Sequence, residues 1–321
     1  MSKLRQIALI AFDGFQILDI TGPASVFSAA NDALGKPHYQ AVTISAKGEL
    51  VSSHSGISIQ SQSYKSSKLA SIDTLLIAGG SANGLEELSR NEPFMKWIKQ
   101  TAQGTRRYGS VCTGAFVLGR LGLLKKKKVA THWGSCQKLA TLYPEAEVDA
   151  NALFVNQGKL WTSAGVTTGI DMSLEMVAQD LGTEIANVIA KRLVLYAKRP
   201  GYQSQFSPLL KAQENAVPKF LKLVEWLGKN LDQNIDIPRM AEQMAMSERT
   251  FYRKFTERFG ETPRNYVEKL RLENARNILS SKTSLKQIAI LNGYATAAQL
   301  TKAFERQFGV SPMMFRKMHC Q

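Results

Sequence analysis

The stretch from Ile237 to Phe315 constrains this chain most, because it contains the same unit twice. Segments 255–263 and 304–312 share two Phe residues, a Gly and a Pro at one constant offset. Further out, the repeat pairs Phe251 with Leu300, Tyr266 with Phe315 and, if the second turn around Gly293 is one residue longer, Ala241 with Ala289. Repeated spacing of this kind indicates repeated supersecondary structure.

Each copy has the pattern of two short helices separated by a turn. In the first copy, Phe251, Phe255 and Phe259 recur every four residues and predict an apolar stripe, with basic side chains on the other faces. That helix is expected to begin at the cap Ser247 and to end at Gly260, which tolerates a left-handed helix end. Further cap signals stand at Thr262-Pro263, Ser284, Thr296 and Ser311-Pro312. The C-terminal part is therefore predicted to be all-α, with two helix-turn-helix motifs.

A helix-turn-helix with a basic outer face suits the major groove of double-stranded DNA, which admits one α-helix and presents a distinct pattern for each base pair. Two such units, joined by a helix over about 263–280, would reach successive major grooves roughly 34 Å apart. The alternative is a helical bundle whose charged face is only solvated. The doubled motif favours DNA as the partner.

The distribution of charge agrees with a DNA partner. The net charge is +15, and residues 218–321 carry 18 Lys and Arg against 10 Asp and Glu, whereas residues 1–217 carry 23 against 16. Positive charge is thus denser in the C-terminal part, as neutralisation of phosphates requires. The sequence shows no membrane span and no secretory signal, so we expect a cytoplasmic protein without membrane contact. Three widely spaced cysteines indicate neither a disulfide scaffold nor a metal cluster, and nothing calls for a cofactor.

Segment 237–315 resembles the AraC-type DNA-binding domain, most specifically at Ile288-Ala289, Gly293-Tyr294, Phe304, Phe308-Gly309 and Ser311-Pro312. It departs from the family at Leu300, where an aromatic residue is common. The resemblance implies that exposed positions early in two helices meet the bases. These positions are Arg249, Tyr252, Arg253, Ala297, Ala298, Gln299, Thr301 and Lys302. Arg suits guanine, Gln suits adenine and Ala can touch a thymine methyl, so the second helix is predicted to be the weaker hydrogen-bonding reader.

The residues before about 200 alternate strands with helices. An uninterrupted apolar run over 7–12 has the pattern of a strand buried on both faces of a parallel sheet. Further strands are predicted at 39–45, at 72–78, up to Val111 and at 129–131, with a hairpin across 156–158. Helices are predicted up to 34, over 86–102, from 113, up to 142, and over 168–180 and 183–198. This alternation predicts a doubly wound, mostly parallel α/β sheet.

The carboxyl ends of such strands collect chemistry, and Asp19, Cys112 and His132 fall there. Cys112 stands between a strand and a helix amid Gly, Ser and Ala, which is the composition of a sharp nucleophile turn. The following helix N-terminus is expected to lower the thiol pKa, and the amides of Gly80 and Thr113 are the natural oxyanion donors. His132 ends the next strand and is placed to approach Cys112.

Each of these three residues also has a purely structural interpretation. Cys112 is then inert packing, Asp19 caps the helix of residues 20–34, and His132 is a hydrogen-bonded core histidine beside Trp133. The local sequence leaves these alternatives open.

Segments 18–23, 110–118, 130–133 and 162–165 together resemble the PfpI-like division of the class I glutamine amidotransferase-like fold, which is a flavodoxin-like α/β layer structure. With an AraC-type domain behind it, the whole chain resembles the GlxA-type transcriptional regulators of the AraC family. This resemblance implies a sensor domain over 1–198, a linker over 199–217 and a DNA-binding domain over 218–321. Arg199 opens the linker segment 199–206, which is also similar to that group.

The resemblance does not carry over a complete catalytic set. PfpI-like peptidases place a His directly after the nucleophile, where this chain has Thr113, and the glutaminases bring a late His, whereas the only His after His132 is His319. Relatives that hydrate isonitriles use a Cys with an Asp equivalent to Asp19. A thiol without a placed general base is a modest hydrolytic catalyst.

The leading hypothesis is therefore a DNA-binding regulator rather than an enzyme. Its first domain would sense a small metabolite, nitrogen-containing by family resemblance, in a pocket formed by Asp19, Gly80, Cys112, Thr113 and His132. Two alternatives are a bifunctional cysteine-dependent hydrolase or hydratase that also binds DNA, and a redox sensor acting through Cys112. Dimerisation through the first domain is expected from the family and from the two-fold symmetry of many operators.

Overall fold

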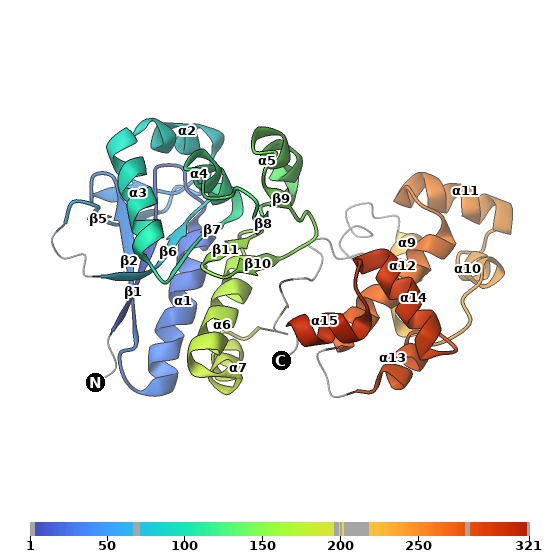
Figure 1. The fold of residues 1–321 in the computed structure, drawn as a ribbon. Coiled ribbons are helices and arrows are strands. Elements are labelled where there is room, and N and C mark those ends of the chain that lie inside the picture. Colours follow the sequence, from blue (N-terminus) through green and yellow to red (C-terminus); the bar gives the residue numbers. More distant parts are fainter. Residues whose placement is uncertain are drawn as a thin grey trace. The chain divides into compact units, whose positions relative to one another are not determined.

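The computed structural model describes residues 4–66, 71–195, 199, 201, 218–279 and 283–319. The chain divides into two compact units, Met1–Gln205 and Phe206–Gln321 (Figure 1). Each unit has its own cluster of buried apolar side chains. Of the predicted linker 199–217, only Arg199 and Gly201 lie within the described residues, and so the proposed hinge over 213–215 lies outside them.

The first unit is built on a sheet whose described strands run in the order β10-β11-β7-β6-β1-β2-β5. The strands are β1 (Arg5–Ile10), β2 (Tyr39–Ser45), β5 (Gln62–Ser63), β6 (Ile72–Ile77), β7 (Arg107–Val111), β10 (Phe154–Gln157) and β11 (Leu160–Ser163). All neighbours are parallel except β10 and β11, which form the predicted hairpin. Two short ribbons complete the unit, β3 (Leu50–Ser52) with β4 (Ser58–Gln60) and β8 (Lys128–Val129) with β9 (Glu147–Val148).

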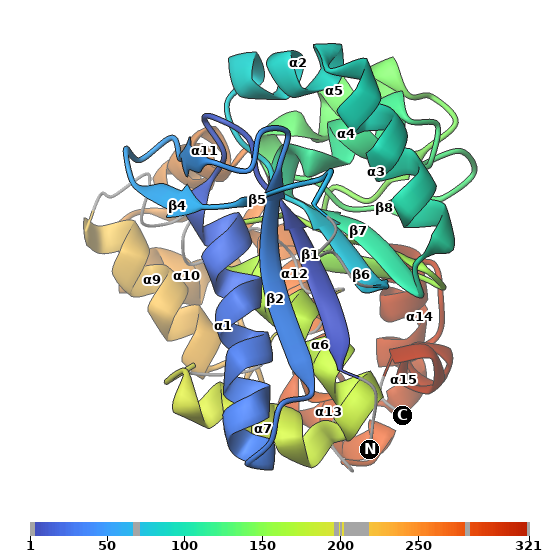
Figure 2. The same cartoon turned by 90° about the vertical axis from the view of Figure 1, so that its left-hand side faces the viewer.

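Helices cover both faces of this sheet, as the alternating pattern predicted. They are α1 (Ile17–Leu34), α2 (Ala82–Arg90), α3 (Glu92–Gly104), α4 (Ala115–Arg120), α5 (Cys136–Leu142), α6 (Thr168–Leu181) and α7 (Thr183–Arg192). Helices α1, α6 and α7 pack against one another on one face, and α2, α3 and α4 lie on the other (Figure 2). The side chains of β1 from Ile7 to Ile10 are at most 1% exposed, which confirms a central strand buried on both faces.

Two predicted boundaries are wrong for local reasons. The single helix expected over 86–102 is two helices, because the Asn91 side chain accepts a hydrogen bond from the Phe94 amide and starts α3, with Pro93 in its first turn. Helix α7 ends at Arg192 and not at the predicted Lys198, and Val194 adopts a left-handed φ of 54° two residues after the end. The Asn-x-Pro signal was present in the sequence at residues 91–93.

An ion-pair cluster closes the amino ends of the strands. The Asp180 carboxylate on α6 pairs with Arg5, Arg106 and Arg107 at 2.6, 2.8 and 3.0 Å and accepts a hydrogen bond from the Tyr39 hydroxyl. Burial opposes ionisation of this carboxyl, yet the hydrogen bond from Arg106 and the charge of Arg107 hold its pKa at about 2. The cluster ties α6 to three strands of the sheet at the end remote from Cys112.

The second unit contains only helices among its described residues. They are α9 (Pro218–Lys229), α10 (Ile237–Gln243), α11 (Glu248–Phe259), α12 (Pro263–Ile278), α13 (Leu285–Leu291), α14 (Ala297–Phe308) and α15 (Pro312–His319). The repeat is visible in the packing, because Phe251 on α11 and Leu300 on α14 are both 0% exposed. Leucine thus fills the aromatic position of the second motif without leaving the core.

The predicted caps of these helices are confirmed. Ser247, Thr262 and Thr296 each accept a hydrogen bond from an amide of the following turn, and Ser284 forms a complete capping box with Gln287. Both recognition-type helices end at a left-handed glycine, Gly260 and Gly309. In the described part of the chain, no helix has the length and apolarity needed to cross a membrane.

Candidate functional site

Cys112 lies on a strained turn at the carboxyl end of β7. Its φ is 56°, a left-handed value that is unusual for a residue other than glycine, and a short 3-10 turn, Cys112–Gly114, leads from it into α4. Glycines crowd around it. A Cβ on Gly79 would lie 2.6 Å from the Thr113 nitrogen, and a Cβ on Gly165 would lie 2.2 Å from the Cys112 Cβ. The crowding inferred from small residues is therefore present, with Gly165 as an additional source.

Asp19 points into this turn instead of capping its own helix. Helix α1 begins after Gln16, and the Asp19 carboxylate accepts hydrogen bonds from the amides of Gly79 at 2.9 Å and Val166 at 2.8 Å. The cap interpretation of Asp19 is thus wrong, since its partners come from two other loops. Burial raises its pKa to about 6, although both amide bonds favour the charged form.

One of the two amides proposed as oxyanion donors, that of Gly80, is already engaged. The Gly80 amide donates to the Thr113 hydroxyl at 3.0 Å, and that hydroxyl lies 3.2 Å from the Gly80 carbonyl oxygen, to which it can donate. The Thr113 amide and hydroxyl both favour the thiolate form of Cys112 by hydrogen bonding. In this conformation the Gly80 amide is held by the Thr113 hydroxyl, so it would have to leave that partner before it could stabilise an oxyanion.

The expected lowering of the Cys112 pKa is also wrong. Burial raises it to about 12, and the nearby Asp19 charge contributes in the same direction, outweighing the hydrogen bonds from Thr113. Cys112 is only 8% exposed. A thiol in this state is almost wholly protonated at neutral pH, which makes it a poor nucleophile.

His132 is connected to Cys112 through its neighbour. The Thr131 hydroxyl donates to the Cys112 carbonyl oxygen at 2.9 Å, which places the end of β8 beside the cysteine turn. The His132 Nδ1 accepts a hydrogen bond from the Gly134 amide at 3.3 Å, and its ring packs on Trp133. Burial lowers the His132 pKa, so the neutral ring with Nε2 protonated fits these contacts. A protonated Nε2 cannot take a proton from Cys112.

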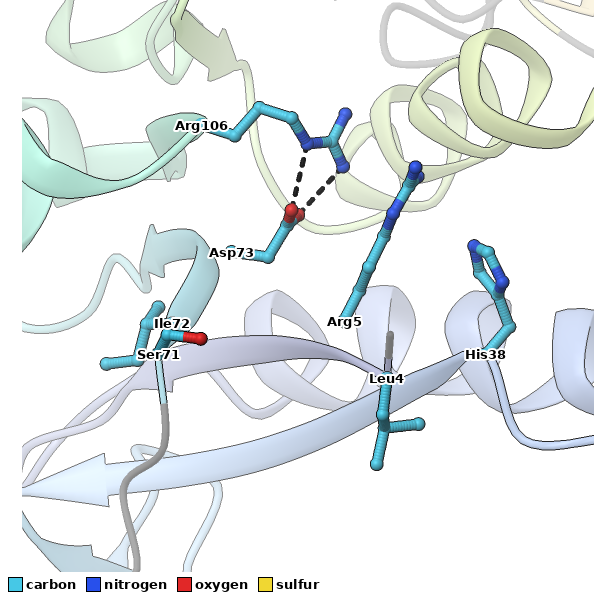
Figure 3. Close-up of a pocket in the computed structure, with 7 residues that line it drawn as sticks. All are labelled: Leu4, Arg5, His38, Ser71, Ile72, Asp73 and Arg106. Carbon is cyan, nitrogen blue, oxygen red and sulfur yellow. Dashed lines mark hydrogen bonds and ion pairs between the residues drawn. The ribbon is translucent and has the colours of Figure 1, made fainter. Parts of the chain in front are cut away.

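A cavity of about 380 Å³ lies elsewhere, at the amino ends of the strands (Figure 3). Its lining includes Arg5, His38, Asp73 and Arg106, and Figure 3 shows Arg106 turned toward Asp73, which it binds through two hydrogen bonds. Both arginines also pair with Asp180, and so their charge is compensated within the ion-pair cluster. We assign this end a structural role and keep the Cys112 turn as the candidate site.

Sequence reasoning missed the loop 165–167. Gly165 packs on Cys112, Val166 adopts a φ of 52° and donates its amide to Asp19, and the Thr167 hydroxyl accepts from Arg199 at 2.8 Å. In the sequence, segment 162–165 stands out only through its family resemblance. The contacts of this loop are made by backbone groups or by residues far apart in sequence, which leave no local signal.

In the first motif, the three residues expected to meet bases are exposed. Arg249, Tyr252 and Arg253 lie on the side of α11 opposite the buried Phe251 and Phe255. Arg253 pairs with Glu257 at 3.0 Å, a solvent-exposed ion pair of the kind that contributes about 0–1 kcal/mol. Such a pair is readily exchanged for a base or a phosphate.

In the second motif, two of the polar candidates make hydrogen bonds with nearby backbone groups. The Gln299 Oε1 accepts from the Ala295 amide at 3.1 Å, and the Thr301 hydroxyl donates to the Ala297 carbonyl at 2.8 Å. Ala298 and Lys302 are exposed, whereas Ala297 and Thr301 are half-buried. The structure thus keeps the difference in hydrogen-bonding capacity between the two helices that the sequence predicted.

Comparisons with known proteins agree with this two-unit organisation. Residues 5–179 match the DJ-1/PfpI family, and residues 240–318 match a helix-turn-helix domain. HTH-type transcriptional regulator GbdR of Pseudomonas aeruginosa is 26% identical over 96% of this chain and 83% of its own length. HTH-type transcriptional regulator GlxA of Rhizobium meliloti is 25% identical over 98% of this chain and 96% of its own length.

Two further proteins resemble a part of this chain. An isonitrile hydratase of Pseudomonas putida is 30% identical over 62% of this chain and 82% of its own length. The crystal structure of a THiJ/PfpI family protein from Pseudomonas syringae superposes with a TM-score of 0.56 at 22% identity, covering 70% of this chain and 88% of that one. The latter likeness supports the fold alone.

Proposed function

We propose that this chain, which belongs to the DJ-1/PfpI family, is a sequence-specific DNA-binding transcription regulator whose first unit senses a small molecule. The observation that carries the DNA-binding part is the pair of helix-turn-helix motifs with capped recognition helices, α11 and α14. GbdR and GlxA, which are similar to nearly the whole of this chain, are also named as transcriptional regulators. For such a protein we propose a cytoplasmic location, because it acts on the chromosome.

The first motif should supply most of the sequence specificity. Arg249 and Arg253 present guanidinium groups that can bind guanine bidentately, and Tyr252 adds an exposed hydroxyl. The second helix offers the Ala298 methyl for a thymine and the Lys302 ammonium for a phosphate, while Gln299 is held by the Ala295 amide. We therefore propose hydrogen-bonded reading by α11 and mainly apolar and electrostatic contact by α14.

This proposal is tested by selecting duplexes from a random library with the full-length protein. We expect an enriched site in which guanine positions and a thymine-containing block are separated by about ten base pairs, one turn of the duplex. Arg249→Ala should lose the guanine preference, and Lys229→Ala on α9 is the matched control for removal of one positive charge. A library without enrichment, bound equally well by both variants, would reduce the unit to a non-specific basic surface.

For the first unit, the closed state of the Cys112 turn favours sensing over catalysis. The thiol is protonated, the Gly80 amide is held by the Thr113 hydroxyl, and the His132 Nδ1 accepts from the Gly134 amide. A ligand that displaces the Thr113 hydroxyl from the Gly80 amide would convert this turn from one arrangement to another, which is the requirement for a ligand-driven shift. We propose a ligand that contacts Asp19, Gly80, Cys112, Thr113 and His132, and the family resemblance suggests a nitrogen-containing metabolite.

The alternative of a cysteine-dependent hydratase or hydrolase has one supporting observation, the identity with isonitrile hydratase. Native mass spectrometry of the full chain incubated with pooled metabolites separates the two functions, with Cys112→Ser in parallel. An unmodified bound compound, retained by both proteins, supports the sensor. Consumption or covalent capture of a compound by the wild type alone supports the enzyme.

The dimer expected from two-fold operators belongs to the same proposal. Sedimentation of the full chain at micromolar concentration, with and without a selected duplex, measures it directly. A single monomeric protein on a duplex with one site would contradict the dimer and leave the DNA-binding proposal intact.

A further inference from the structure

The loop 165–167 has one end in the candidate site. Gly165 lies so close to Cys112 that an added Cβ would be 2.8 Å from Sγ and 2.2 Å from Cβ. The next residue, Val166, holds a left-handed φ of 52° and donates its amide to the buried Asp19 carboxylate. A β-branched residue in this conformation is strained, so the Asp19 contact and the surrounding packing fix the loop in its present form.

The other end of the loop meets the start of the predicted linker. The Arg199 guanidinium binds the Asp171 carboxylate on α6 at 2.6 and 3.0 Å and donates to the Thr167 hydroxyl at 2.8 Å. The Asp171 side chain is 96% buried, whereas the Arg199 side chain is about one-third exposed. Arg199 thus holds the loop and the buried carboxylate at the same time.

A second contact fixes the same point of the chain. The Gly201 carbonyl oxygen accepts from the amides of Leu153 and Phe154 at 2.6 and 3.1 Å, and the Leu153 carbonyl in turn accepts from the Ala164 amide at 2.7 Å. Ala164 directly precedes the loop. Two independent sets of hydrogen bonds therefore connect Arg199 and Gly201 to residues 164–167.

We propose that the loop 165–167 is the element that couples occupancy of the Cys112 site to release of the linker at Arg199 and Gly201. This inference rests on the proposed sensor function and assigns its mechanism of regulation. A ligand atom that enters between the Cys112 thiol and Gly165 would displace Gly165, and movement of the loop would break the Val166–Asp19 or the Thr167–Arg199 contact. Release of Arg199 and Gly201 then detaches this point of the chain from the first unit. Arg199 is a positioning residue in this scheme, because it acts through Thr167 and Asp171.

Coupling of this kind is reciprocal, so it is measurable without a ligand. Loosening the linker end should expose the site end, and the alkylation rate of Cys112 by iodoacetamide reports the opening of the site. Tryptic peptides 108–120 and 129–138 contain Cys112 and Cys136 separately, so buried Cys136 serves as an internal control for general unfolding.

The first arm uses the full-length protein with Arg199→Gln and Thr167→Val. Thr167 is exposed and valine has nearly its shape, so this variant removes the hydroxyl contact without disturbing the core. We expect both variants to accelerate Cys112 alkylation by roughly two- to thirty-fold, the range that contacts along a packed network give. Cys136 should not change. Arg192→Gln, which breaks the exposed Arg192–Asp32 ion pair at 2.7 Å on the same unit, is the matched control and should leave both rates unchanged.

The second arm runs in the opposite direction. Asp19→Asn replaces one acceptor oxygen by an amide group that cannot accept, and it should accelerate hydrogen exchange of the Leu153 and Phe154 amides, which Gly201 protects. Exchange is read by mass spectrometry of peptides that cover these two amides.

The coupling is refuted if Arg199→Gln speeds exchange at Leu153 and Phe154 while Cys112 alkylation stays at the wild-type rate. If Arg199→Gln raises both cysteine rates together, the Thr167→Val variant decides, and an unchanged Cys112 rate in that variant also overturns the proposal. Neither arm uses DNA or an effector. Failure here therefore leaves the regulator and sensor proposals standing, and their own tests can fail independently.

Discussion

The Asp19 carboxyl gives the sharpest test of the site geometry, because its ionisation opposes folding. Burial raises its pKa from 3.8 to about 6 in the folded protein. Between these two pH values the folded state binds more protons than the unfolded state, so the free energy of unfolding must fall as pH rises. This direction is opposite to that of the ion-paired Asp180, whose pKa is lowered.

The size of the effect follows from the two pKa values. At about 1.4 kcal/mol for each pKa unit, the difference between 3.8 and about 6 corresponds to a total loss of about 3 kcal/mol of unfolding free energy, of which about 2 kcal/mol falls between pH 4 and pH 7. Asp19→Asn cannot ionise and should lack this loss. The pH dependence contributed by every other group is common to both proteins and cancels in their difference.

The assay is urea unfolding of the full chain at several pH values from 4 to 7.5, followed by tryptophan fluorescence. A Trp226→Phe background removes the tryptophan of the second unit, so that Trp97, Trp133 and Trp161 report only on the first. The unfolding free energy of wild type minus that of Asp19→Asn should decline through pH 4–6 and then level off. A flat difference, or one that increases with pH, would mean that the two amide hydrogen bonds outweigh burial and that the argument for this site is wrong.

Three further predictions concern both units. Ala245 lies in the turn of the first motif with a φ of 50°, so Ala245→Gly should stabilise the second unit by up to about 1 kcal/mol in thermal unfolding. Gly293→Ala, at the matching turn of the second motif, should destabilise the unit, because the added Cβ would lie 2.5 Å from a carbonyl oxygen. Arg253→Ala should weaken binding to a selected duplex by about 1–3 kcal/mol and relax the base preference of the protein, while Gln299→Ala should weaken that binding less. If Arg253→Ala weakens binding to random DNA equally, Arg253 contacts a phosphate. Hydrogen peroxide should leave DNA binding unchanged, since the protonated Cys112 thiol oxidises slowly, and a peroxide response lost in Cys112→Ser would favour the redox alternative.

The sequence carried the architecture because the relevant signals are local or periodic. The repeated Phe spacing predicted two motifs with buried stripes, and the caps at Ser247, Ser284 and Thr296 are where cap residues stand in the sequence. The apolar run in β1 predicted a strand buried on both faces, and residues 7–10 are at most 1% exposed. Leu300 replaces an aromatic residue, yet its place in the period was enough to predict burial.

The chemistry of the site was less predictable because it depends on contacts between distant residues. Asp19 resembles a helix cap in the sequence, but its acceptor oxygens face amides that are 60 and 147 residues away. Cys112 stands before a helix, which predicted a low pKa, whereas burial and the Asp19 charge decide the sign. Neither the packing of Gly165 on Cys112 nor the Thr113–Gly80 pairing has a signature in local composition.

These contacts also favour the proposed sensing role of the Cys112 turn over catalysis. A nucleophile needs an exposed thiolate and free oxyanion donors, and here the thiol is buried and the Gly80 amide is held by Thr113. A ligand that displaces Gly80 or Gly165 when it binds beside the thiol would disturb a segment that donates to the Asp19 carboxylate. A site that opens only at the expense of its own hydrogen bonds has two distinct arrangements, and a ligand that favours one of them changes the population of both. The strain at Cys112 and Val166 is consistent with this interpretation, since left-handed residues are retained where the surrounding structure overdetermines them.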